Sequence, residues 1–188
     1  MFGVPLCIGL LPVVFHHDSH TLHIMSTVLQ SAVHGRFSGC YQGHPNHAVF
    51  DSLDPGDILF CHDDGGGYGY YTHCAMYVGN GTVVESSNFR QGTQELPIDN
   101  FHFYDDVNVM RLRCPYTLRQ SAARYALAQV DKGYNIFGGL QDGMSMYCSK
   151  LIWSAYHSQG VDLCPSSRWI LPDDLAVSSK LDNVNVSS

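Results

Sequence analysis

Cys148 is the residue whose position in this sequence most favours covalent chemistry. It follows the polar, glycine-containing stretch 142–145 and opens an apolar pattern with helical spacing that runs from Leu151 to Tyr156. A thiol at a helix N-terminus has a lowered pKa, because the unpaired N–H groups and the helix dipole favour the thiolate. The same N–H groups can bind the oxyanion that forms when a thiolate attacks a carbonyl. The position of Cys148 therefore predicts a nucleophile for acyl transfer.

His73 and Glu85 are the residues best placed to activate such a nucleophile. His73 opens a predicted strand directly after the glycine-rich stretch 62–71, and Glu85 lies inside the apolar returning strand. A carboxylate in that setting costs free energy unless it is paired. A histidine partner would satisfy it, and the carboxylate would in turn fix the imidazole tautomer and stabilise the imidazolium. We therefore predict a catalytic set of Cys148, His73 and Glu85.

The turn between the two strands decides whether His73 can reach Glu85. Asn80-Gly81 is a typical dipeptide of two-residue hairpin turns. A strict two-residue turn would place the two side chains on opposite faces of the sheet. Their contact requires a β-bulge, a longer turn or bent strand ends. Asn88, which the strict register pairs with His73, is the alternative orienting residue.

The elements around these residues predict one α+β catalytic domain over residues 53–188. Residues 1–52 are expected to form an N-terminal extension, irregular or with a short helix near 26–33, that is either separate or part of the same domain. The expected strands are 57–61, 73–78, 82–86 and 107–112, and the expected helices are 117–131, one from Cys148 to about Gly160, and a short one from Asp173.

Composition narrows the class of protein. The chain has 188 residues, of which 45% are hydrophobic and 14% charged, as in a globular domain. A formal net charge of −7 argues against a nucleic-acid partner, because phosphate binding needs clustered Lys and Arg. Seven cysteines without a CxxC pair favour reduced thiols and a reducing, cytoplasmic compartment. The apolar stretch Phe2–Phe15 is too short to span a bilayer, but it leaves a secreted or surface protein open.

Two histidine-containing stretches invite a metal-site hypothesis. His16, His20 and His23 would share one face of a helix, but no Cys or Asp pattern frames them. His62 is followed by Asp63 and Asp64, which we interpret as a solvated loop. The prediction is therefore that the protein uses no metal and no cofactor.

Five segments, in this order, carry a resemblance to a known family. They are Asp54–Phe60 with its PGDI opening, Thr72–Gly81 followed by 83–86, Gly133–Asn135, Met146–Leu151, and Leu171–Leu175. Together they resemble the circularly permuted papain-like cysteine peptidases and amidases, the YiiX-like branch of the NlpC-type superfamily. The His, acid, Cys order is similar to that of this permuted branch and of lecithin retinol acyltransferase-like enzymes.

The resemblance implies an antiparallel sheet or small barrel packed against helices, with the catalytic cysteine at a helix N-terminus. It implies Cys148 as nucleophile, His73 as base and Glu85 as third polar residue. Lys150 departs from the family pattern, where Glu is frequent after Cys-Ser. The tyrosines that we assign to substrate binding are Tyr70, Tyr71, Tyr134 and Tyr147.

The function expected from this resemblance is hydrolysis of an amide through a thioester, with a peptide or peptidoglycan fragment as substrate. One alternative is an acyltransferase or thioesterase acting on lipid acyl groups, which a longer apolar groove would favour. Another alternative is a non-catalytic binding protein of the same fold. The expected partner is a small peptide or acyl-amide substrate, with membrane association and oligomeric state left open.

Overall fold

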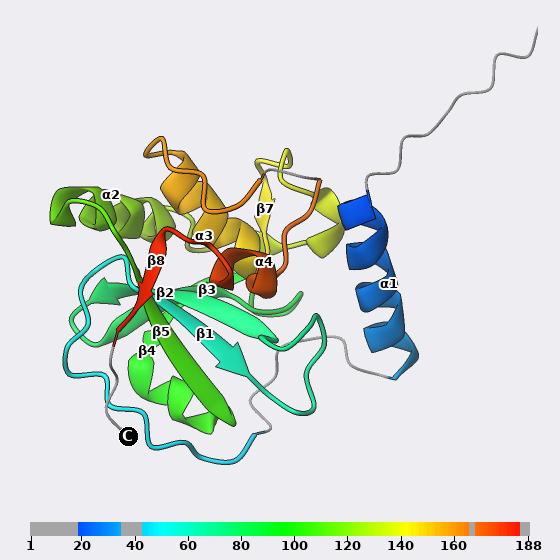
Figure 1. The fold of residues 1–188 in the computed structure, drawn as a ribbon, viewed down its shortest axis with the longest axis horizontal. Coiled ribbons are helices and arrows are strands. Elements are labelled where there is room, and N and C mark those ends of the chain that lie inside the picture. Colours follow the sequence, from blue (N-terminus) through cyan, green and yellow to red (C-terminus); the bar gives the residue numbers. More distant parts are fainter. Residues whose placement is uncertain (1–18, 35–42, 166–167, 185–188) are drawn as a thin grey trace, which may run out of the picture.

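A six-stranded antiparallel sheet forms the centre of the molecule, with helices packed on one of its faces (Figure 1). The computed structural model describes residues 19–34, 43–165 and 168–184. The strands follow the order β4-β3-β2-β1-β5-β8, so the sheet is open, with β4 and β8 at its edges. The strands of this sheet are β1 (Ile58–His62), β2 (His73–Gly79), β3 (Thr82–Ser86), β4 (Thr93–Pro97), β5 (Asp106–Leu112) and β8 (Leu181–Asn183).

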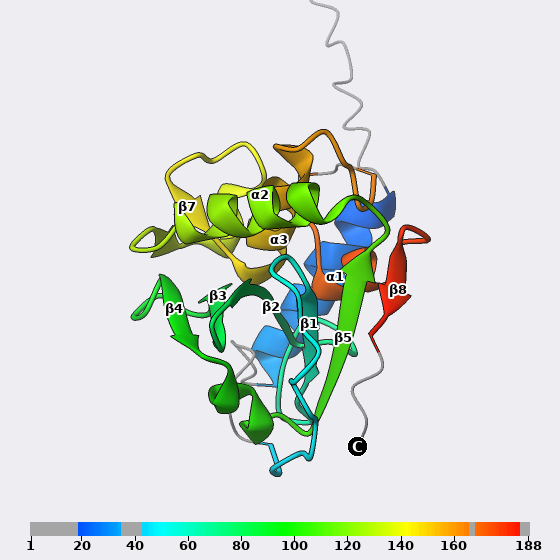
Figure 2. The same cartoon turned by 90° about the vertical axis from the view of Figure 1, so that its left-hand side faces the viewer.

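The helices and a small second sheet lie around this centre. The α-helices are α1 (Ser19–Val33), α2 (Tyr116–Leu127), α3 (Cys148–His157) and α4 (Pro172–Ala176), and the 3-10 helices are η1 (Ile98–Phe103) and η2 (Ile136–Gly138). The second sheet pairs β6 (Gly133–Tyr134) with β7 (Ser145–Met146) in parallel. In Figure 2, α2 and α3 cross above the strands, whereas η1 lies at the opposite end of the molecule. This mixed helix and antiparallel-sheet architecture confirms the expected α+β class.

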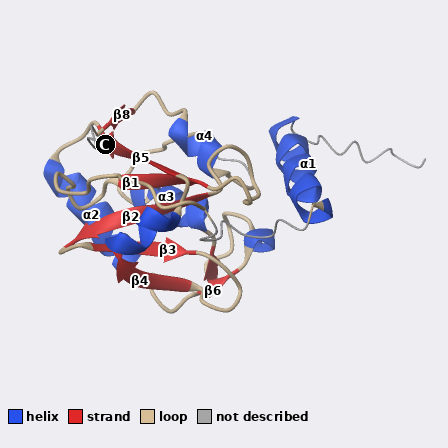
Figure 3. Ribbon diagram, turned by 90° about the horizontal axis from the view of Figure 1, so that it is seen from below, coloured by secondary structure: helices blue, strands red, loops and turns tan. Residues whose placement is uncertain are grey.

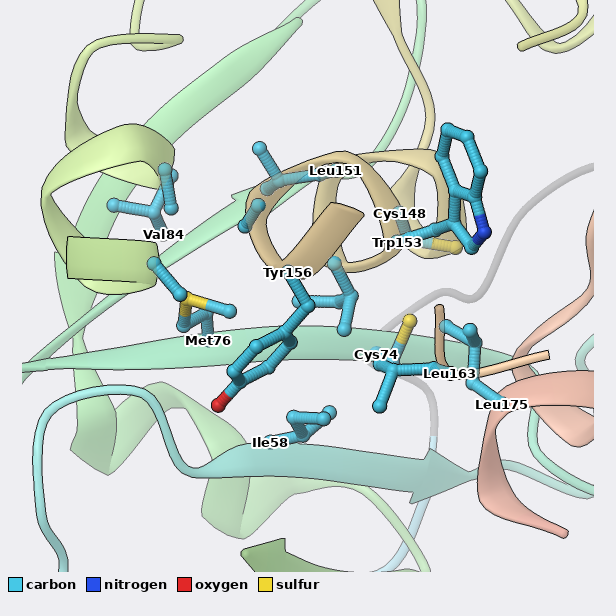
Figure 4. Close-up of a cluster of buried hydrophobic side chains, with 14 of the residues drawn as sticks. Ile58, Cys74, Met76, Val84, Cys148, Leu151, Trp153, Tyr156, Leu163 and Leu175 are labelled. Atoms are coloured by element: carbon cyan, nitrogen blue, oxygen red, sulfur yellow. The ribbon is translucent and has the colours of Figure 1, made fainter. Parts of the chain in front are cut away.

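Alternating residues of β1, β2 and β3 contribute to two separate cores. One core joins the sheet to α2 and α3, and in it Cys74 and Met76 of β2 pack near Leu151 and Tyr156 of α3 (Figure 4). The other core lies on the opposite face, where Ala75 packs with residues of η1 and its surroundings. Successive side chains of a strand point to opposite faces, which produces this division. Neighbouring residues of β2 consequently face different surroundings.

An ion pair between buried Asp57 and half-buried Arg111 holds the turn that begins β1. The Asp57 carboxylate accepts a hydrogen bond from the Asp54 backbone N–H at 2.8 Å and one from Arg111 Nε at 2.8 Å. Asp57 is fully buried, so the Arg111 guanidinium compensates a charge that would otherwise be costly. The start of β1 is thereby tied to β5.

The structure corrects several of the expected boundaries. The N-terminal helix α1 is fifteen residues long and begins at Ser19 rather than near residue 26. The helix expected over 117–131 ends at Leu127. The edge strands β4 and β8 were not expected, because β4 is mostly polar and ends in proline, and β8 is only three residues long. Within the described residues, no helix is long and apolar enough to cross a bilayer.

Candidate active site

A β-bulge in the β2–β3 hairpin sets the faces of the predicted base and acid. Tyr77 pairs with Val83 and Gly79 pairs with Thr82, so Val78 is an extra residue on β2. The next pairs place Val84 opposite Met76 and hence Glu85 opposite Ala75. Glu85 therefore shares a face with Ala75 and with His73, two residues away. Contact between His73 and Glu85 requires a β-bulge or a similar irregularity, and the structure contains a β-bulge at Val78.

The backbone of the turn explains how the extra residue is accommodated. Gly79, Asn80 and Gly81 have φ angles of 103°, 53° and 74°. Glycine and asparagine are the residues that tolerate this left-handed region. The Gly-Asn-Gly sequence thus permits a tight turn directly beside the bulge at Val78.

His73 and Glu85 form a buried ion pair. His73 Nε2 lies 2.8 Å from Glu85 Oε2, and the two side chains are 2% and 0% exposed. The other carboxylate oxygen, Oε1, accepts a hydrogen bond from Gln94 Nε2 of β4 at 3.1 Å. The His73 ring also stacks on Tyr104, with 6.0 Å between ring centroids and 8° between planes. These contacts fix the ring and leave Nδ1 for a further partner.

The charge of Glu85 keeps His73 protonated. Burial by itself lowers the pKa of His73, but the Glu85 charge and the hydrogen bonds to Cys148 and Glu85 outweigh it and raise the pKa to about 10. An imidazolium at neutral pH is the form that stabilises a neighbouring thiolate.

Cys148 begins α3 and meets both His73 and Cys74. Hydrogen bonding from the Cys74 side chain, and after it from His73 and the Cys74 backbone, favours the thiolate form of Cys148. Figure 4 shows Cys74 rising from β2 toward the start of α3, where Cys148 lies. These donors, the Cys74 thiol foremost, lower the pKa of Cys148 well below its ordinary value despite burial.

The other cysteines among the described residues behave differently. Burial raises the pKa of each of them, namely Cys61, Cys74, Cys114 and Cys164. All are free thiols. Cys148 is therefore the only described cysteine whose pKa is shifted toward the thiolate, which is the reactive form.

The loop before Cys148 is held by a buried lysine. Lys150 is 1% exposed, and its Nζ donates to the Gly139 carbonyl at 2.8 Å and to the Asp142 carbonyl. Tyr147 occupies the N-cap position of α3 without a side-chain cap hydrogen bond. The Tyr147 side chain therefore leaves the first N–H groups of α3 uncapped. An oxyanion site at this helix end requires such uncapped N–H groups. Lys150, which departs from the family pattern, has a structural role here.

Asp173 of α4 fixes the glycine-rich loop that leads into His73. Its carboxylate accepts hydrogen bonds from the backbone N–H groups of Tyr70 at 2.8 Å and Tyr71 at 2.9 Å. Gly69 has a φ of 125°, and a Cβ there would lie 2.1 Å from Asp173 Oδ2. Only glycine fits at this position. Asp173 was not among the predicted site residues, although it lies in the closing motif of the resemblance.

The four tyrosines assigned to substrate binding have separate surroundings. Tyr70 is exposed and stacks on His62, with 4.3 Å between centroids. The Tyr71 hydroxyl accepts a hydrogen bond from Asn108 Nδ2 at 3.1 Å. Tyr134 and Tyr147 are buried in the core that contains Cys148, whose charge, after burial, contributes to a raised pKa of each. Their role in binding substrate stays a prediction.

Asn88 is engaged away from the histidine. Its Oδ1 accepts hydrogen bonds from the backbone N–H groups of Arg90 at 2.9 Å and Gln91 at 3.1 Å. The bulge has shifted the register that would have paired it with His73. The carboxylate in contact with the imidazole is Glu85.

Two contributors near the site, Gln94 and Cys74, were missed by the sequence reasoning. Gln94 lies on the unexpected edge strand β4, and the Cys74 side chain lies on the helix-covered face of β2. The alternation of β2 offered a signal, because it turns Cys74 toward the helices that carry Cys148.

The metal hypothesis has no support in the described residues. In residues 19–34, 43–165 and 168–184, no group of three or more His, Cys, Asp or Glu side chains is arranged to hold a metal ion. His16 lies outside this part of the chain, as do Phe2–Phe15.

Comparisons with known proteins extend these observations. A family model described as the permuted papain-like amidase enzyme, YaeF/YiiX, C92 family, matches residues 44–171. A similar solved structure is that of the metalloprotein yiiX from Escherichia coli O157:H7, with a TM-score of 0.58 and 14% sequence identity. The match covers 72% of this chain and 98% of that one. The comparison with curated proteins finds no match.

The matched segment of the family model contains the β2–β3 hairpin and the start of α3, with the order His73, Glu85, Cys148. The fold of this chain is similar to that of yiiX. Because the family model spans well over half of the chain, the protein belongs to the permuted papain-like amidase family of YaeF and YiiX.

Proposed function

We propose that the protein hydrolyses an amide bond with Cys148 as nucleophile, His73 as proton donor and acceptor, and Glu85 as the residue that orients His73. The observation that carries this proposal is the buried His73–Glu85 pair, 2.8 Å apart, with Cys148 at the start of α3 among the groups that raise the pKa of His73. The amidase description of the family supports the reaction type.

The resting state in this proposal is an ion pair between the Cys148 thiolate and the His73 imidazolium. The opposite pKa shifts of the two groups support this state, with Cys148 lowered and His73 raised to about 10. His73 therefore does not need to remove a proton before attack. Its first role is that of an acid.

Acylation begins when the Cys148 sulfur attacks the amide carbon and the carbonyl electron pair moves to oxygen. The N–H groups at the start of α3 stabilise the oxyanion. As the carbonyl reforms, the C–N bond breaks, and the amide nitrogen takes the Nδ1 proton of His73. The amine leaves, and a thioester on Cys148 and a neutral His73 remain.

Deacylation uses the neutral imidazole as a base. His73 takes a proton from water while the water oxygen attacks the thioester carbon. The C–S bond then breaks, the acid leaves, and the thiolate and imidazolium are restored. Glu85 stays ionised and holds Nε2 throughout, as the orienting carboxylate does in related triads.

The test combines thiol labelling with turnover. Iodoacetamide at pH 6 should modify Cys148 in preference to the other thiols, as read by peptide mass spectrometry. Turnover of a panel of 7-amino-4-methylcoumarin amides, made from short peptides and carboxylic acids, should disappear in Cys148→Ala and persist in the matched Cys164→Ala. Retained turnover in Cys148→Ala, or preferential labelling of another cysteine, would overturn the proposal.

A further inference from the structure

Two cysteines from distant parts of the sequence come together beside His73. Cys74 directly follows His73 on β2, and Cys148 begins α3, which packs against β2 (Figure 3). The two residues belong to one core cluster, and both have free thiols. In Figure 4 the Cys74 side chain points from β2 toward the start of α3. The fold therefore places a second thiol beside the proposed nucleophile.

Hydrogen bonding joins the two side chains. It is the largest of the influences that lower the pKa of Cys148, and after burial it is the largest of those that raise the pKa of Cys74. Cysteines whose side chains point apart cannot form a disulfide without backbone movement. Because these two side chains contact each other, a bond between their sulfur atoms requires only local adjustment.

The two thiols differ in charge and in access to solvent. Cys148 has a pKa well below its ordinary value and is 7% exposed, whereas Cys74 has a raised pKa and is 0% exposed. Oxidation of cysteine follows thiolate character and exposure, so an oxidant reacts with Cys148 first. A neighbouring thiol can then convert the oxidised cysteine to a disulfide. Cys74 is placed as such a resolving cysteine.

Cys61 shows that nearness alone does not give a thiol this role. It pairs with His73 across β1 and β2, and the charge of Cys148 contributes to its raised pKa. Its side chain, however, belongs to the core on the other face of the sheet, with Ala75 and Phe101. The sheet therefore separates the Cys61 side chain from Cys148, which makes Cys61 a matched control.

We propose that Cys74 and Cys148 form a reversible disulfide when the protein meets a hydroperoxide, and that this bond switches the enzyme off while protecting its nucleophile. The inference rests on Cys148 as the nucleophile of the proposed function, but the bond can be measured without turnover. Disulfides that form in a reducing compartment are usually transient and are often redox-sensing.

Hydrogen peroxide is sufficient as the oxidant. The Cys148 thiolate attacks one peroxide oxygen, the O–O bond breaks, and the leaving hydroxide takes a proton from the His73 imidazolium to become water. Cys148 is then a sulfenic acid. The Cys74 sulfur attacks the Cys148 sulfur, the S–O bond breaks, and the departing hydroxide leaves as water with the Cys74 proton. The peroxide is thereby reduced to water, and the two cysteines together lose two electrons.

The first test is peptide mapping of the whole protein after treatment with a small excess of hydrogen peroxide. Free thiols are blocked with N-ethylmaleimide, and the protein is digested with chymotrypsin, which cleaves after aromatic residues. Peptide 72–77 then carries Cys74 as its only cysteine, and peptide 148–153 carries Cys148 as its only cysteine. Mass spectrometry should find these two peptides linked, and dithiothreitol should separate them. This test needs no variant.

The second test follows turnover at pH 8 in the wild type, Cys74→Ser and Cys61→Ala. Peroxide should inactivate all three proteins. Dithiothreitol should restore the wild type and Cys61→Ala, whereas recovery in Cys74→Ser should be at least about fivefold lower, because its Cys148 proceeds to a sulfinic acid that thiols do not reduce. Dimedone, which traps sulfenic acids, should label Cys148 in Cys74→Ser more strongly than in the wild type.

The possible failures are distinguishable. A linked pair of peptides in a protein that hydrolyses no amide supports the disulfide and contradicts the proposed function. Turnover without the linkage, with Cys148 oxidised to sulfinic acid beside a free Cys74, contradicts the disulfide alone. A bond from Cys148 to any other cysteine, or equal recovery in Cys74→Ser and the wild type, also overturns it.

Discussion

The two halves of the candidate site are built by different means. The β2–β3 hairpin supplies His73 and Glu85 from strands joined by a short turn, and both side chains are buried. The start of α3 supplies Cys148 from a different part of the chain, behind a loop held by Lys150. The base and acid are positioned by local register, whereas the nucleophile is positioned by tertiary packing.

Because of this difference, the geometry of the hairpin depends on local strand pairing, whereas the position of Cys148 depends on distant contacts. A hairpin keeps its internal geometry as long as its register is kept, because cross-strand neighbours follow from the backbone pairing. A helix start brought against β2 depends on the packing of the whole helix layer. Changes to the hairpin should therefore alter the chemistry of the site, and changes behind α3 should alter its geometry.

The largest effect is expected from His73→Ala. The variant loses the proton donor for the leaving amine and the cation beside Cys148, so kcat/KM should fall by about 10²- to 10⁴-fold. The matched control is His62→Ala, since His62 bonds to the Tyr70 carbonyl and to Asp64 in the glycine-rich loop instead. Steady-state kinetics on one amide compares them. Equal losses in both variants would show that the hairpin does not carry the chemistry.

Glu85→Gln should change the pH dependence more than the fold. The Glu85 charge favours the imidazolium and helps raise the pKa of His73 to about 10. Without that charge the ring loses its proton at lower pH, so the alkaline limb of the kcat/KM profile should move from near pH 10 toward neutral. We expect roughly a 10- to 100-fold loss at pH 8. Glu95→Gln, on the neighbouring edge strand, should leave the profile unchanged, and an unmoved limb in Glu85→Gln would contradict the assigned contact.

Lys150→Met tests the support behind the nucleophile. It removes hydrogen bonds from a charged group to the loop carbonyls of Gly139 and Asp142, each worth roughly 1.5–3 kcal/mol. We expect about a tenfold loss of kcat with a lower melting temperature. Lys132→Met is the comparison, because Lys132 donates to Gly143 of the same loop from an exposed position. Similar kcat values in both variants would mean that the loop does not position Cys148.

Cys74→Ala should have the smallest effect, on the acidity of Cys148. The Cys74 thiol is the foremost of the donors that lower the pKa of Cys148. Its loss should raise that pKa, so the acidic limb of iodoacetamide labelling should shift upward and the rate at pH 6 should fall roughly three- to tenfold. Cys61→Ala, on the opposite core, should label normally. Unchanged labelling in Cys74→Ala would remove this thiol from the site.

The sequence predicts well those parts of the site that depend on local residue patterns. The dipeptide Asn80-Gly81 indicated a hairpin, and the apolar spacing after Cys148 indicated a helix beginning there. Gln94 of β4, which donates a hydrogen bond to Glu85, was not predicted, because a polar edge strand has only a weak sequence pattern.

The bulge at Val78 also restricts how this hairpin can change during evolution. Because side chains alternate faces, a single insertion or deletion between His73 and Glu85 would turn the carboxylate toward the helices unless it also removed the bulge. Substitutions within the turn do not change the number of residues between His73 and Glu85, so they do not by themselves move the carboxylate to the other face. Related sequences should therefore vary the spacing between the histidine and the acid in steps of two residues, or exchange a bulged turn for a regular one when the spacing changes by one.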